Sequence, residues 1–295
     1  MRARGPSRTA EYMALFRAVE NAQPPTRRLF ADPYAIKFIS GATKTLATLA
    51  RLPGIGRAVI WFLDVGWPYT RSSGVVRTRL IDDLVCQAFH DGVHQLLLLG
   101  AGFDSRAHRL PEAEEMKVFE VDHPATQAAK RERLNASLGS SSPGQVHYVP
   151  MNFERDDMEH ELLNAGYNKE QRTVVVWEGV ISYLSSEAVH DVFCTLARLL
   201  ASGSILIFTY VDKRAVTGDV KFAGAQRTNR WVRLSGEPFI FGFDPAELKD
   251  YLKSRGFELK SDESTAEAAT SYNSRTGRAE TGSKSYRVTV ADRCS

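Results

Sequence analysis

The stretch from Gln95 to Arg106, QLLLLGAGFDSR, decides the fold of this chain. Its four consecutive leucines show no polar alternation, which is typical of a strand that is buried on both faces of a parallel sheet. Gly100 and Gly102 then allow a sharp turn and the close approach of a ligand to the backbone, and a helical pattern follows. A strand, a glycine turn and a helix make the first half of a nucleotide-type βαβ unit.

The next predicted strand, VFEVD at residues 118–122, ends in acids. Glu120 lies 20 residues after Gly100, where an acid can accept both hydroxyls of a ribose. Two kinds of cofactor fit this pair of features. A nicotinamide dinucleotide and S-adenosylmethionine both contain a ribose.

The glycine turn distinguishes the two cofactors. A dinucleotide fingerprint has a third glycine where this chain has Ser105, and its pyrophosphate disfavours a nearby negative charge such as that of Asp104. S-adenosylmethionine has no phosphate, and its methionine end carries an ammonium and a sulfonium that suit an acid. The turn therefore favours S-adenosylmethionine, with a nicotinamide-dependent oxidoreductase as the alternative.

Composition bounds the class of protein. The 295 residues are 43% hydrophobic, which is ample for the core of one large α/β domain or of a domain plus a cap. Three cysteines, odd in number and without metal-binding spacing, predict a reducing, cytoplasmic environment and no metal site. The N-terminus lacks the apolar run of a secretory signal, and the apolar segment at 58–63 is too short to span a bilayer.

Charge is unevenly distributed along the chain. The net charge is +3, but residues 1–80 hold 13 Lys/Arg and 4 Asp/Glu (+9), whereas the remainder holds 25 and 31 (−6). The basic residues are scattered rather than clustered, and no Asn-Pro-Pro-Tyr motif of nucleic-acid methylation is present. A cap that attracts an acidic small molecule and a merely solvated face are the remaining interpretations. We expect a small-molecule partner, and neither nucleic acid nor a membrane.

The order of predicted elements indicates an α/β fold with a doubly wound parallel sheet. Residues 1–80 are predicted to be helices interrupted by prolines and to form an N-terminal cap, and residues 81–295 form the main domain. Residues 212–243 are basic and aromatic and are predicted to be an insertion after the fifth strand; residues 261–283 are polar with no predicted element. The predicted strands are 96–99, 118–122, 146–149, 173–177, 204–211, 257–260 and 286–290.

Polar groups recur where these strands end, which is where clefts form in such sheets. They are Gly100 to Asp104, Glu120 to Asp122, Asn152 with Phe153, and Glu178. The acids after the second strand and Asn152 could instead cap the helices that follow. Glu178 is harder to explain structurally, because it follows four apolar residues and precedes a glycine.

These motifs together resemble the leucine carboxyl methyltransferase family, in particular its bacterial branch of S-adenosylmethionine-dependent methyltransferases. The resemblance covers nearly the whole chain and implies a class I methyltransferase (Rossmann-like) fold with an added N-terminal helical cap. The residues that carry it are Ser7 to Ala10 with Arg17-Ala18, Leu29 to Ala35, Arg77 to Arg79 with Asp82, Gly100 to Arg106, Phe119 to Pro124, Trp177 to Val180 with Tyr183-Leu184, and Gly242 to Pro245.

The resemblance also implies roles for single residues. Arg77 matches an arginine that holds the cofactor's carboxylate, and Glu178 matches an acid near its amine. Asn152 and Phe153 match the adenine side, with Asn in place of the more usual acid, and Arg17 matches a basic cap residue. The implied cofactor-binding set is Arg77, Gly100, Ala101, Gly102, Asp104, Glu120, Val121, Asp122, Asn152, Phe153, Glu178 and Gly179.

The expected reaction is transfer of a methyl group to the carboxylate of a small, acidic metabolite with an apolar body. A carboxylate is already ionised at neutral pH, so no general base is needed. Tyr183, Arg227, Arg230 and Trp231 are the candidates for contact with the acceptor. A hydroxyl acceptor would require a base, for which His147 and His190 are candidates, and a protein C-terminal carboxyl group is a further alternative acceptor.

Overall fold

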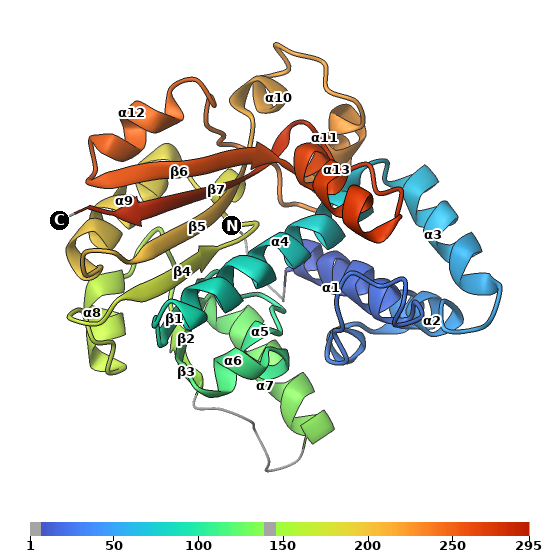
Figure 1. Ribbon diagram of the computed structural model, residues 1–295, viewed down its shortest axis with the longest axis horizontal. Coiled ribbons are helices and arrows are strands. Elements are labelled where there is room, and N and C mark those ends of the chain that lie inside the picture. The colour runs from blue at the N-terminus through green and yellow to red at the C-terminus, as the bar shows by residue number, and fades with distance from the viewer. Residues whose placement is uncertain (1–6, 139–145, 295) are drawn as a thin grey trace.

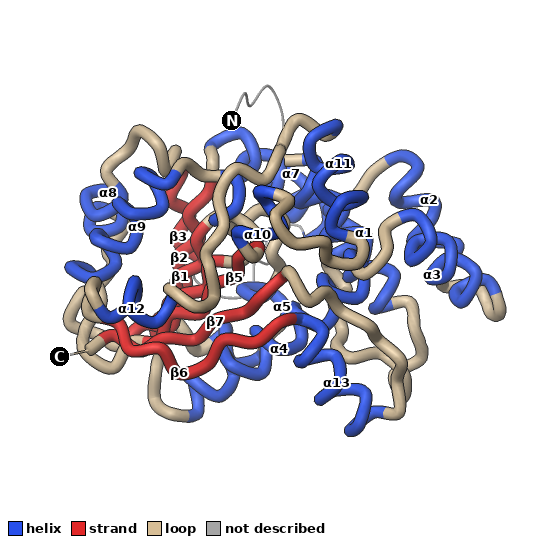
Figure 2. The backbone as a smooth tube through the Cα atoms, turned by 90° about the horizontal axis from the view of Figure 1, so that it is seen from above, coloured by secondary structure: helices blue, strands red, loops and turns tan. Residues whose placement is uncertain are grey.

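The computed structural model describes residues 7–138 and 146–294. It contains one seven-stranded sheet of order β3-β2-β1-β4-β5-β7-β6, in which β7 runs antiparallel to its two neighbours and the other pairs are parallel (Figures 1 and 2). This is the doubly wound, Rossmann-like sheet that the sequence predicts. The strands are β1 Gln95–Leu99, β2 Lys117–Asp122, β3 Val146–Pro150, β4 Thr173–Trp177, β5 Ile205–Val211, β6 Phe257–Ser264 and β7 Tyr286–Arg293.

The central strands are buried on both faces because helices cover both sides of the sheet. Leu97 and Leu99 pack with α8 (Met158–Asn164), α9 (Ser186–Leu199) and α12 (Leu248–Lys253). Leu96 and Leu98 face the other way and pack against α4 (Thr70–His90), while α5 (Arg106–Arg109) and α6 (Pro111–Glu114) complete that layer. The alternation of side chains along β1 thus divides the core into two layers.

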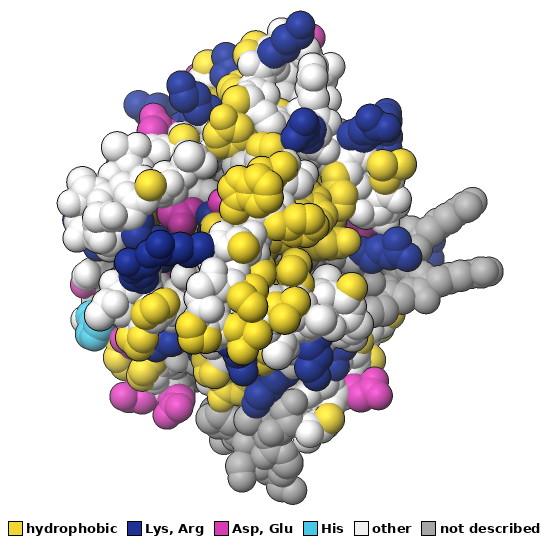
Figure 3. All heavy atoms as spheres, turned by 90° about the vertical axis from the view of Figure 1, so that its right-hand side faces the viewer, with side chains coloured by type: hydrophobic (Ala, Val, Ile, Leu, Met, Phe, Trp, Pro, Cys, Tyr) yellow, Lys and Arg dark blue, Asp and Glu magenta, His cyan; other side chains and the backbone are white. Residues whose placement is uncertain are grey.

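The N-terminal residues form a helical cap with its own core. Its elements are α1 (Arg8–Asn21), the 3-10 helix η1 (Ala35–Phe38), α2 (Gly41–Leu49) and α3 (Ile55–Gly66). The predicted boundary after residue 80 lies inside the continuous helix α4, so cap and sheet share one helix, and the division into two units stays a prediction. The cap side of the molecule exposes a stripe of hydrophobic side chains (Figure 3).

The main departure from the predicted elements lies in the polar segment before β7. Helix α13 (Thr265–Thr276) occupies much of residues 261–283, where no element was predicted. Its start does have a sequence signal: Ser264 and Glu267 form a capping box, in which each side chain bonds the other residue's backbone N–H. Its buried residues Ala268, Ala269 and Tyr272 pack against α4.

Three α-helices and one 3-10 helix complete the elements of the described residues. Helix α7 spans Pro124–Leu138. The segment SSSPG at 140–144, whose composition predicts a loop, lies outside the described residues. The region predicted as an insertion holds α10 (Lys213–Thr217) and α11 (Ala225–Leu234), and η2 (Ile181–Tyr183) follows β4. None of the helices in the described residues is long and apolar enough to cross a membrane.

Candidate functional site

A cavity of about 220 Å³ lies beyond the carboxyl ends of β1, β2 and β4. The cap forms one wall through α1 and the start of α4, and α11 with the loop after it forms another. Arg77, Gly100, Ala101, Gly102, Asp104, Asp122, Asn152, Phe153, Glu178 and Gly179 line this cavity. Ten of the twelve predicted cofactor residues therefore meet in one place, although they come from five separate segments of the chain.

Gly100 lines the cavity, and both its backbone conformation and a neighbouring side chain require a glycine at this position. Its φ of +64° is a conformation that side chains rarely adopt, and a Cβ atom there would lie 2.2 Å from Cγ2 of Val180. This packing requirement adds to the expected role of Gly100 beside a ligand, which stays a prediction. It allows the turn after β1 to approach the turn after β4.

Asp122 fastens the glycine turn to the end of β2. Its Oδ2 accepts a hydrogen bond from the Gly102 N–H at 2.6 Å, and its Oδ1 accepts one from the His123 N–H at 2.6 Å. Burial raises the pKa of Asp122 to about 6, even though these two bonds favour the charged form. Each oxygen has further capacity to accept a hydrogen bond from a ligand in the cavity.

Glu120 and Val121 do not line the cavity, although both were predicted to bind cofactor. Val121 is fully buried in the core. Glu120 is also fully buried, its Oε2 pairs with Nζ of Lys130 on α7 at 2.7 Å, and burial raises the pKa of its carboxyl group. Two residues along a strand correspond to about 6–7 Å, so Glu120 lies that much deeper in the sheet than Asp122.

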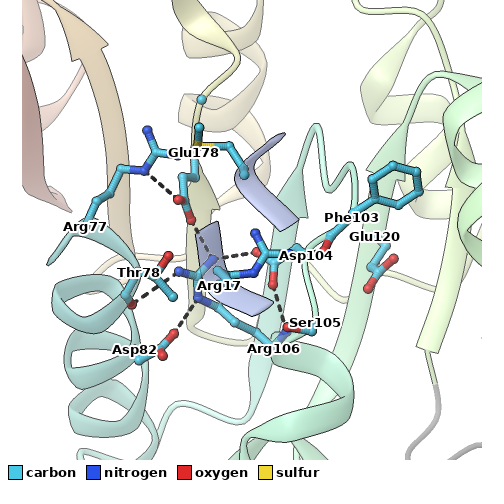
Figure 4. Close-up of polar contacts among 12 residues, drawn as sticks. Arg17, Arg77, Thr78, Asp82, Phe103, Asp104, Ser105, Arg106, Glu120 and Glu178 are labelled. Atoms are coloured by element: carbon cyan, nitrogen blue, oxygen red, sulfur yellow. Dashed lines mark hydrogen bonds and ion pairs between the residues drawn. The ribbon is translucent and has the colours of Figure 1, made fainter. Parts of the chain in front are cut away.

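Glu178, at the end of β4, joins two arginines (Figure 4). Its Oε1 accepts from Nε of Arg77 and its Oε2 from Nη1 of Arg106, both at 2.6 Å. Burial by itself would raise the pKa of Glu178, but the two guanidinium groups hold it below its ordinary value. An ionised Glu178 can therefore sit at the cavity wall without an uncompensated charge.

Arg106 is the centre of this network and was not predicted to be part of the site. Besides Glu178, it pairs through Nε with Asp82 at 2.8 Å and through Nη1 with Asp104 at 2.5 Å. Burial would raise the pKa of Asp104, and Arg106 instead lowers it below its ordinary range. Arg106 is only 2% exposed, so its positive charge is compensated by these three carboxylates and not by water.

The network continues from Asp82 into the cap. Arg109 donates two hydrogen bonds to Asp82, and Ser105 and Arg17 both donate to Asp32 in the cap. The connected ion pairs contain four arginines and four carboxylates, namely Arg17, Arg77, Arg106, Arg109, Asp32, Asp82, Asp104 and Glu178. Their formal charges balance, which is the condition under which so many charges can be buried together.

The adenine-side pair predicted after β3 also reaches the cavity. Oδ1 of Asn152 accepts from the Glu154 N–H at 3.0 Å, so its side chain holds a turn as well as lining the cavity. Helix α8 starts later, with Asp157 as its N-cap, so Asn152 is not that helix's cap. Phe153 packs against the main core.

The predicted acceptor residues divide into two groups. Tyr183 and Trp231 line the cavity, with Tyr183 against Phe239 (ring centroids 5.2 Å apart) and Trp231 against Tyr12 (4.6 Å). Arg227 and Arg230 are exposed on α11 and lie outside the lining. His147 and His190 are also outside it: His147 stacks on Phe119 in the sheet, and His190 contacts Arg255.

Several lining residues had no sequence signal. Tyr69 lines the cavity with a φ of +66°, which makes it the one non-glycine residue with positive φ in the described chain. Tyr286, from β7, lies under Arg77, with its ring centroid 4.8 Å from the guanidinium carbon. Glu237 accepts hydrogen bonds from the backbone and hydroxyl of Thr9 and so ties the loop after α11 to the cap.

The polar groups of the site that can still bind a ligand suit S-adenosylmethionine. Nε of Arg77 bonds Glu178 and Nη2 contacts Sδ of Met13, while Nη1 has no hydrogen-bond partner among the described residues. That nitrogen can donate to the cofactor's carboxylate. Asp122 can accept from ribose hydroxyls, and Glu178 offers negative charge to the amine. Nothing in this set would suit a pyrophosphate, since Asp104, Asp122 and Glu178 are all acids.

Comparison with known proteins identifies the family. The family model for leucine carboxyl methyltransferase matches residues 10–197. A Frankia alni protein named for S-adenosyl-L-methionine-dependent methyltransferase activity is 36% identical over 202 residues, 68% of each chain. One from Mycolicibacterium smegmatis, with a name of the same kind, is 30% identical over 262 residues, 85% of this chain and 81% of its own.

Solved structures agree on the fold. A Streptomyces avermitilis protein superposes with a TM-score of 0.62 over 98% of both chains at 17% identity. A Thermobifida fusca protein superposes with a TM-score of 0.63 at 17% identity, over 99% of this chain and 96% of its own. Fold, site and family model together show that this chain belongs to the leucine carboxyl methyltransferase family and is an S-adenosylmethionine-dependent methyltransferase.

Proposed function

We propose that the protein transfers a methyl group to the carboxylate of a small acceptor with an apolar body. The observation that carries this proposal is the composition of the cavity wall beside Arg77. Tyr183 and Tyr286 bring two phenol groups to that wall, and both candidate histidine bases lie elsewhere. Such a wall can hold an anion. His123, the one histidine among the lining residues, follows Asp122 at the end of β2, and its Nδ1 accepts a hydrogen bond from the Ala125 N–H.

Tyr183 is suited to donate a hydrogen bond. Burial raises the pKa of its phenol far above the ordinary value, with Tyr286 and Glu237 adding to the rise. The hydroxyl therefore stays protonated at every physiological pH, so it can donate a hydrogen bond to a carboxylate but cannot act as a base. The family's name, which describes carboxyl methylation, supports the same kind of acceptor.

The apolar body of the acceptor would be held by the cap and the loop after α11. Met13, Trp231, Val232 and Phe239 line this part of the cavity. Arg227 and Arg230 do not contribute there, so the arginines of the lining are Arg77 and Arg17, and Arg17 is already paired with Asp32. Selectivity for an acid would then depend on hydrogen-bond donors more than on net charge.

The residues of the chain can account for the reaction without a proton transfer. When bound, S-adenosylmethionine supplies a sulfonium methyl group that a nucleophile can displace in line. Arg77, Asp122 and Glu178 would hold the cofactor, and Tyr183 would orient the acceptor carboxylate. The apolar wall would exclude water that otherwise stabilises the carboxylate, which matters because the charges of nucleophile and sulfonium neutralise each other during transfer.

Incubation with labelled S-adenosylmethionine and matched acceptors tests this proposal. The panel contains hydrophobic acids, their amides, phenols of similar size and a peptide that ends in leucine. We expect base-labile methyl esters of the small acids and no labelled amides. Methylation of phenols or amides without any acid would exclude the carboxylate acceptor, and methylation of the peptide alone would exclude the small acceptor.

A single substitution separates the carboxylate from the hydroxyl reaction. Glu237 is the one lining carboxylate near the acceptor wall that lies outside the buried ion-pair network of the described residues. A reaction that needs a base would depend on its charge, whereas a carboxylate acceptor would not. Glu237→Gln should therefore retain most of the activity on acids, because the amide oxygen can still accept from Thr9.

Cofactor affinity is expected to fall at acid pH because of Asp122. The pKa of this carboxyl is about 6 in the protein, and only its ionised form accepts hydrogen bonds at both oxygens from ribose hydroxyls. Lowering the pH through 6 protonates the free protein, so affinity should drop by up to about tenfold per pH unit. Calorimetry with S-adenosylhomocysteine between pH 5 and 7 measures this.

Asp122→Asn is the control for that titration. Asparagine keeps the shape of the side chain and one acceptor oxygen but does not titrate in this range. The variant should bind more weakly at pH 7 and lose the pH dependence. If wild-type affinity is the same at pH 5 and pH 7, or if the variant keeps the same slope, Asp122 is not the group that meets the ribose.

A further inference from the structure

Exposed hydrophobic side chains concentrate on the cap. Of the ten large hydrophobic residues that the described part of the chain exposes, six lie between residues 49 and 65. These six form what we name the cap patch: Leu49, Leu52, Ile55, Trp61, Phe62 and Val65. Trp61 is 67% exposed, Phe62 56% and Val65 51%. Single exposed hydrophobic residues are common on protein surfaces, whereas several gathered in one short stretch indicate an interaction site.

Helix α3 is apolar on both sides. Gly56, Val59 and Leu63 are its buried residues and face the cap core. Ile55, Trp61, Phe62 and Val65 lie on the outward side, at spacings that place them along one stripe of a helix. A surface helix of a globular protein is normally polar on its outward face. Packing against the cap core therefore explains the buried apolar residues of α3 but not the exposed ones.

Basic residues surround the cap patch. Residues 33–63 contain four Lys/Arg and no Asp/Glu, and of these Lys44, Arg51 and Arg57 are exposed. Asp64, the acid of α3, pairs with Arg71 at 2.7 Å. Figure 3 shows the hydrophobic stripe with Lys and Arg side chains beside it.

Helix α11 extends the basic surface. Nη1 of Arg227 donates to the carbonyl oxygen of Val65 at 3.2 Å, which places α11 at the C-terminal end of α3. Arg230 and Arg233 are exposed on the same helix. The arginines that do not line the cavity thus add their charge to the surroundings of the cap patch.

We propose that the cap patch docks on the surface of a lipid bilayer that contains anionic headgroups. Interfacial helices combine Trp, Phe and Leu on one side with Lys and Arg at their edge, so that apolar side chains enter the acyl boundary and cations meet the headgroups. Helix α3 has 12 residues, far fewer than a bilayer span requires, so it would lie in the plane of the surface.

The positive charge around the cap patch makes a second copy of the chain a less suitable partner than an anionic bilayer. A two-fold interface would place the cap patch against itself, so arginines would face arginines with no acid between residues 33 and 63 to balance them. An anionic surface provides the opposite charge. The proposal departs from the expectation of no membrane partner, which rested only on the absence of a spanning segment.

Docking in this way would bring the cavity wall close to the lipid. Helix α3 ends at Gly66, and Pro68 and Tyr69 already line the cavity. Trp67, between them, packs against Trp231 of the opposite cavity wall, with ring centroids 6.3 Å apart. Only Trp67 to Tyr69 would therefore separate the docked helix α3 from helix α4, which contributes to the cavity wall.

Vesicle flotation with the full-length protein tests the proposal. The vesicles are phosphatidylcholine alone, or phosphatidylcholine and phosphatidylglycerol in a two-to-one mixture. We expect binding to the anionic vesicles, weakened by high salt, and little binding to the neutral ones. Trp61→Ser/Phe62→Ser and Arg51→Glu/Arg57→Glu should each lower the partition coefficient by about tenfold or more.

Matched controls lie at the other end of the molecule. Leu163→Ser removes an exposed hydrophobic residue of α8, which lies far from α3 in Figures 1 and 2. Lys169→Glu/Lys253→Glu changes the net charge as much as the arginine double variant, at exposed positions. Both controls should bind like wild type, and thermal melting checks that every variant is folded.

Three outcomes would overturn the proposal. The first is the absence of binding to anionic vesicles. The second is binding that the two cap-patch variants leave unchanged, or that the charge control weakens equally. The third is a dimer in sedimentation that Trp61→Ser/Phe62→Ser dissociates, because the cap patch would then be covered by a second copy of the chain.

Discussion

Arg106→Met is expected to lower the free energy of unfolding by about 3–5 kcal/mol, because it removes one partner from a buried cluster of charges. Arg106 pairs with Asp82, Asp104 and Glu178. Asp82 and Glu178 keep other arginines, Arg109 and Arg77, but Asp104 loses the group that lowers its pKa. A buried carboxylate without a partner must then protonate or be hydrated, and both cost stability. Urea unfolding at pH 7 measures the loss.

Arg198→Met is the matched control for Arg106→Met. Arg198 is 58% exposed and pairs with Glu159 at 3.0 Å on the surface. Exposed pairs contribute about 0–1 kcal/mol, so this variant should unfold almost like wild type. Arg106→Lys keeps the charge but not the planar fork and should fall between the two. A loss below about 1 kcal/mol in Arg106→Met would show that the network does not depend on its central cation.

Arg77→Ala is expected to weaken the binding of S-adenosylmethionine by about 2–5 kcal/mol while the protein remains folded. The substitution removes the guanidinium whose Nη1 is available to the cofactor's carboxylate. Glu178 keeps Arg106 as a partner at 2.6 Å, so the fold does not acquire an unpaired buried carboxylate. The expected loss corresponds to about thirtyfold or more in the dissociation constant. Calorimetry with S-adenosylhomocysteine and a thermal melt give the two quantities.

Arg79→Ala provides the control on the same helix. Arg79 lies two residues further along α4, is about one-third exposed, and pairs with Asp83 outside the cavity. Its removal should leave cofactor affinity unchanged. Normal affinity and normal melting in Arg77→Ala would contradict the assignment of Arg77 to the cofactor, whatever the acceptor proves to be.

The strands could be predicted from the sequence because local composition decides them. Runs such as Leu96 to Leu99 and Thr173 to Trp177 are buried on both faces, and few other structures accommodate an uninterrupted apolar run of that length. The glycine turn follows β1 and Asp122 is the last residue of β2, so their meeting at the cavity follows from the parallel order of the two strands. Helix α13 was missed even though Ser264 and Glu267 carry a capping signal, because its polar composition hid the signal.

The partners of Arg106 could not be predicted in the same way. Asp104 is two residues away, but Asp82 and Glu178 lie 24 and 72 residues away in the chain. Only the packing of α4 and β4 beside the glycine turn brings these two carboxylates within hydrogen-bond distance. Nothing in the local sequence distinguishes such a buried arginine from a solvated one. The burial of Glu120 within the sheet could not be predicted either, because it depends on an ion pair with Lys130 on the next helix.

The sequence by itself determined the α/β class and the helical cap, because these depend on local periodicity. Motifs of adjacent residues carried the resemblance to the family, and that resemblance implied ten of the residues that line the cavity. The tertiary structure alone decided which charged side chains enter that cavity. On α11, Trp231 turns inward while Arg227 and Arg230 turn outward. The orientation of a helix of ten residues is set by what packs against it, here Tyr12 and Trp67 of the cap, and the chain order of those residues does not encode that contact.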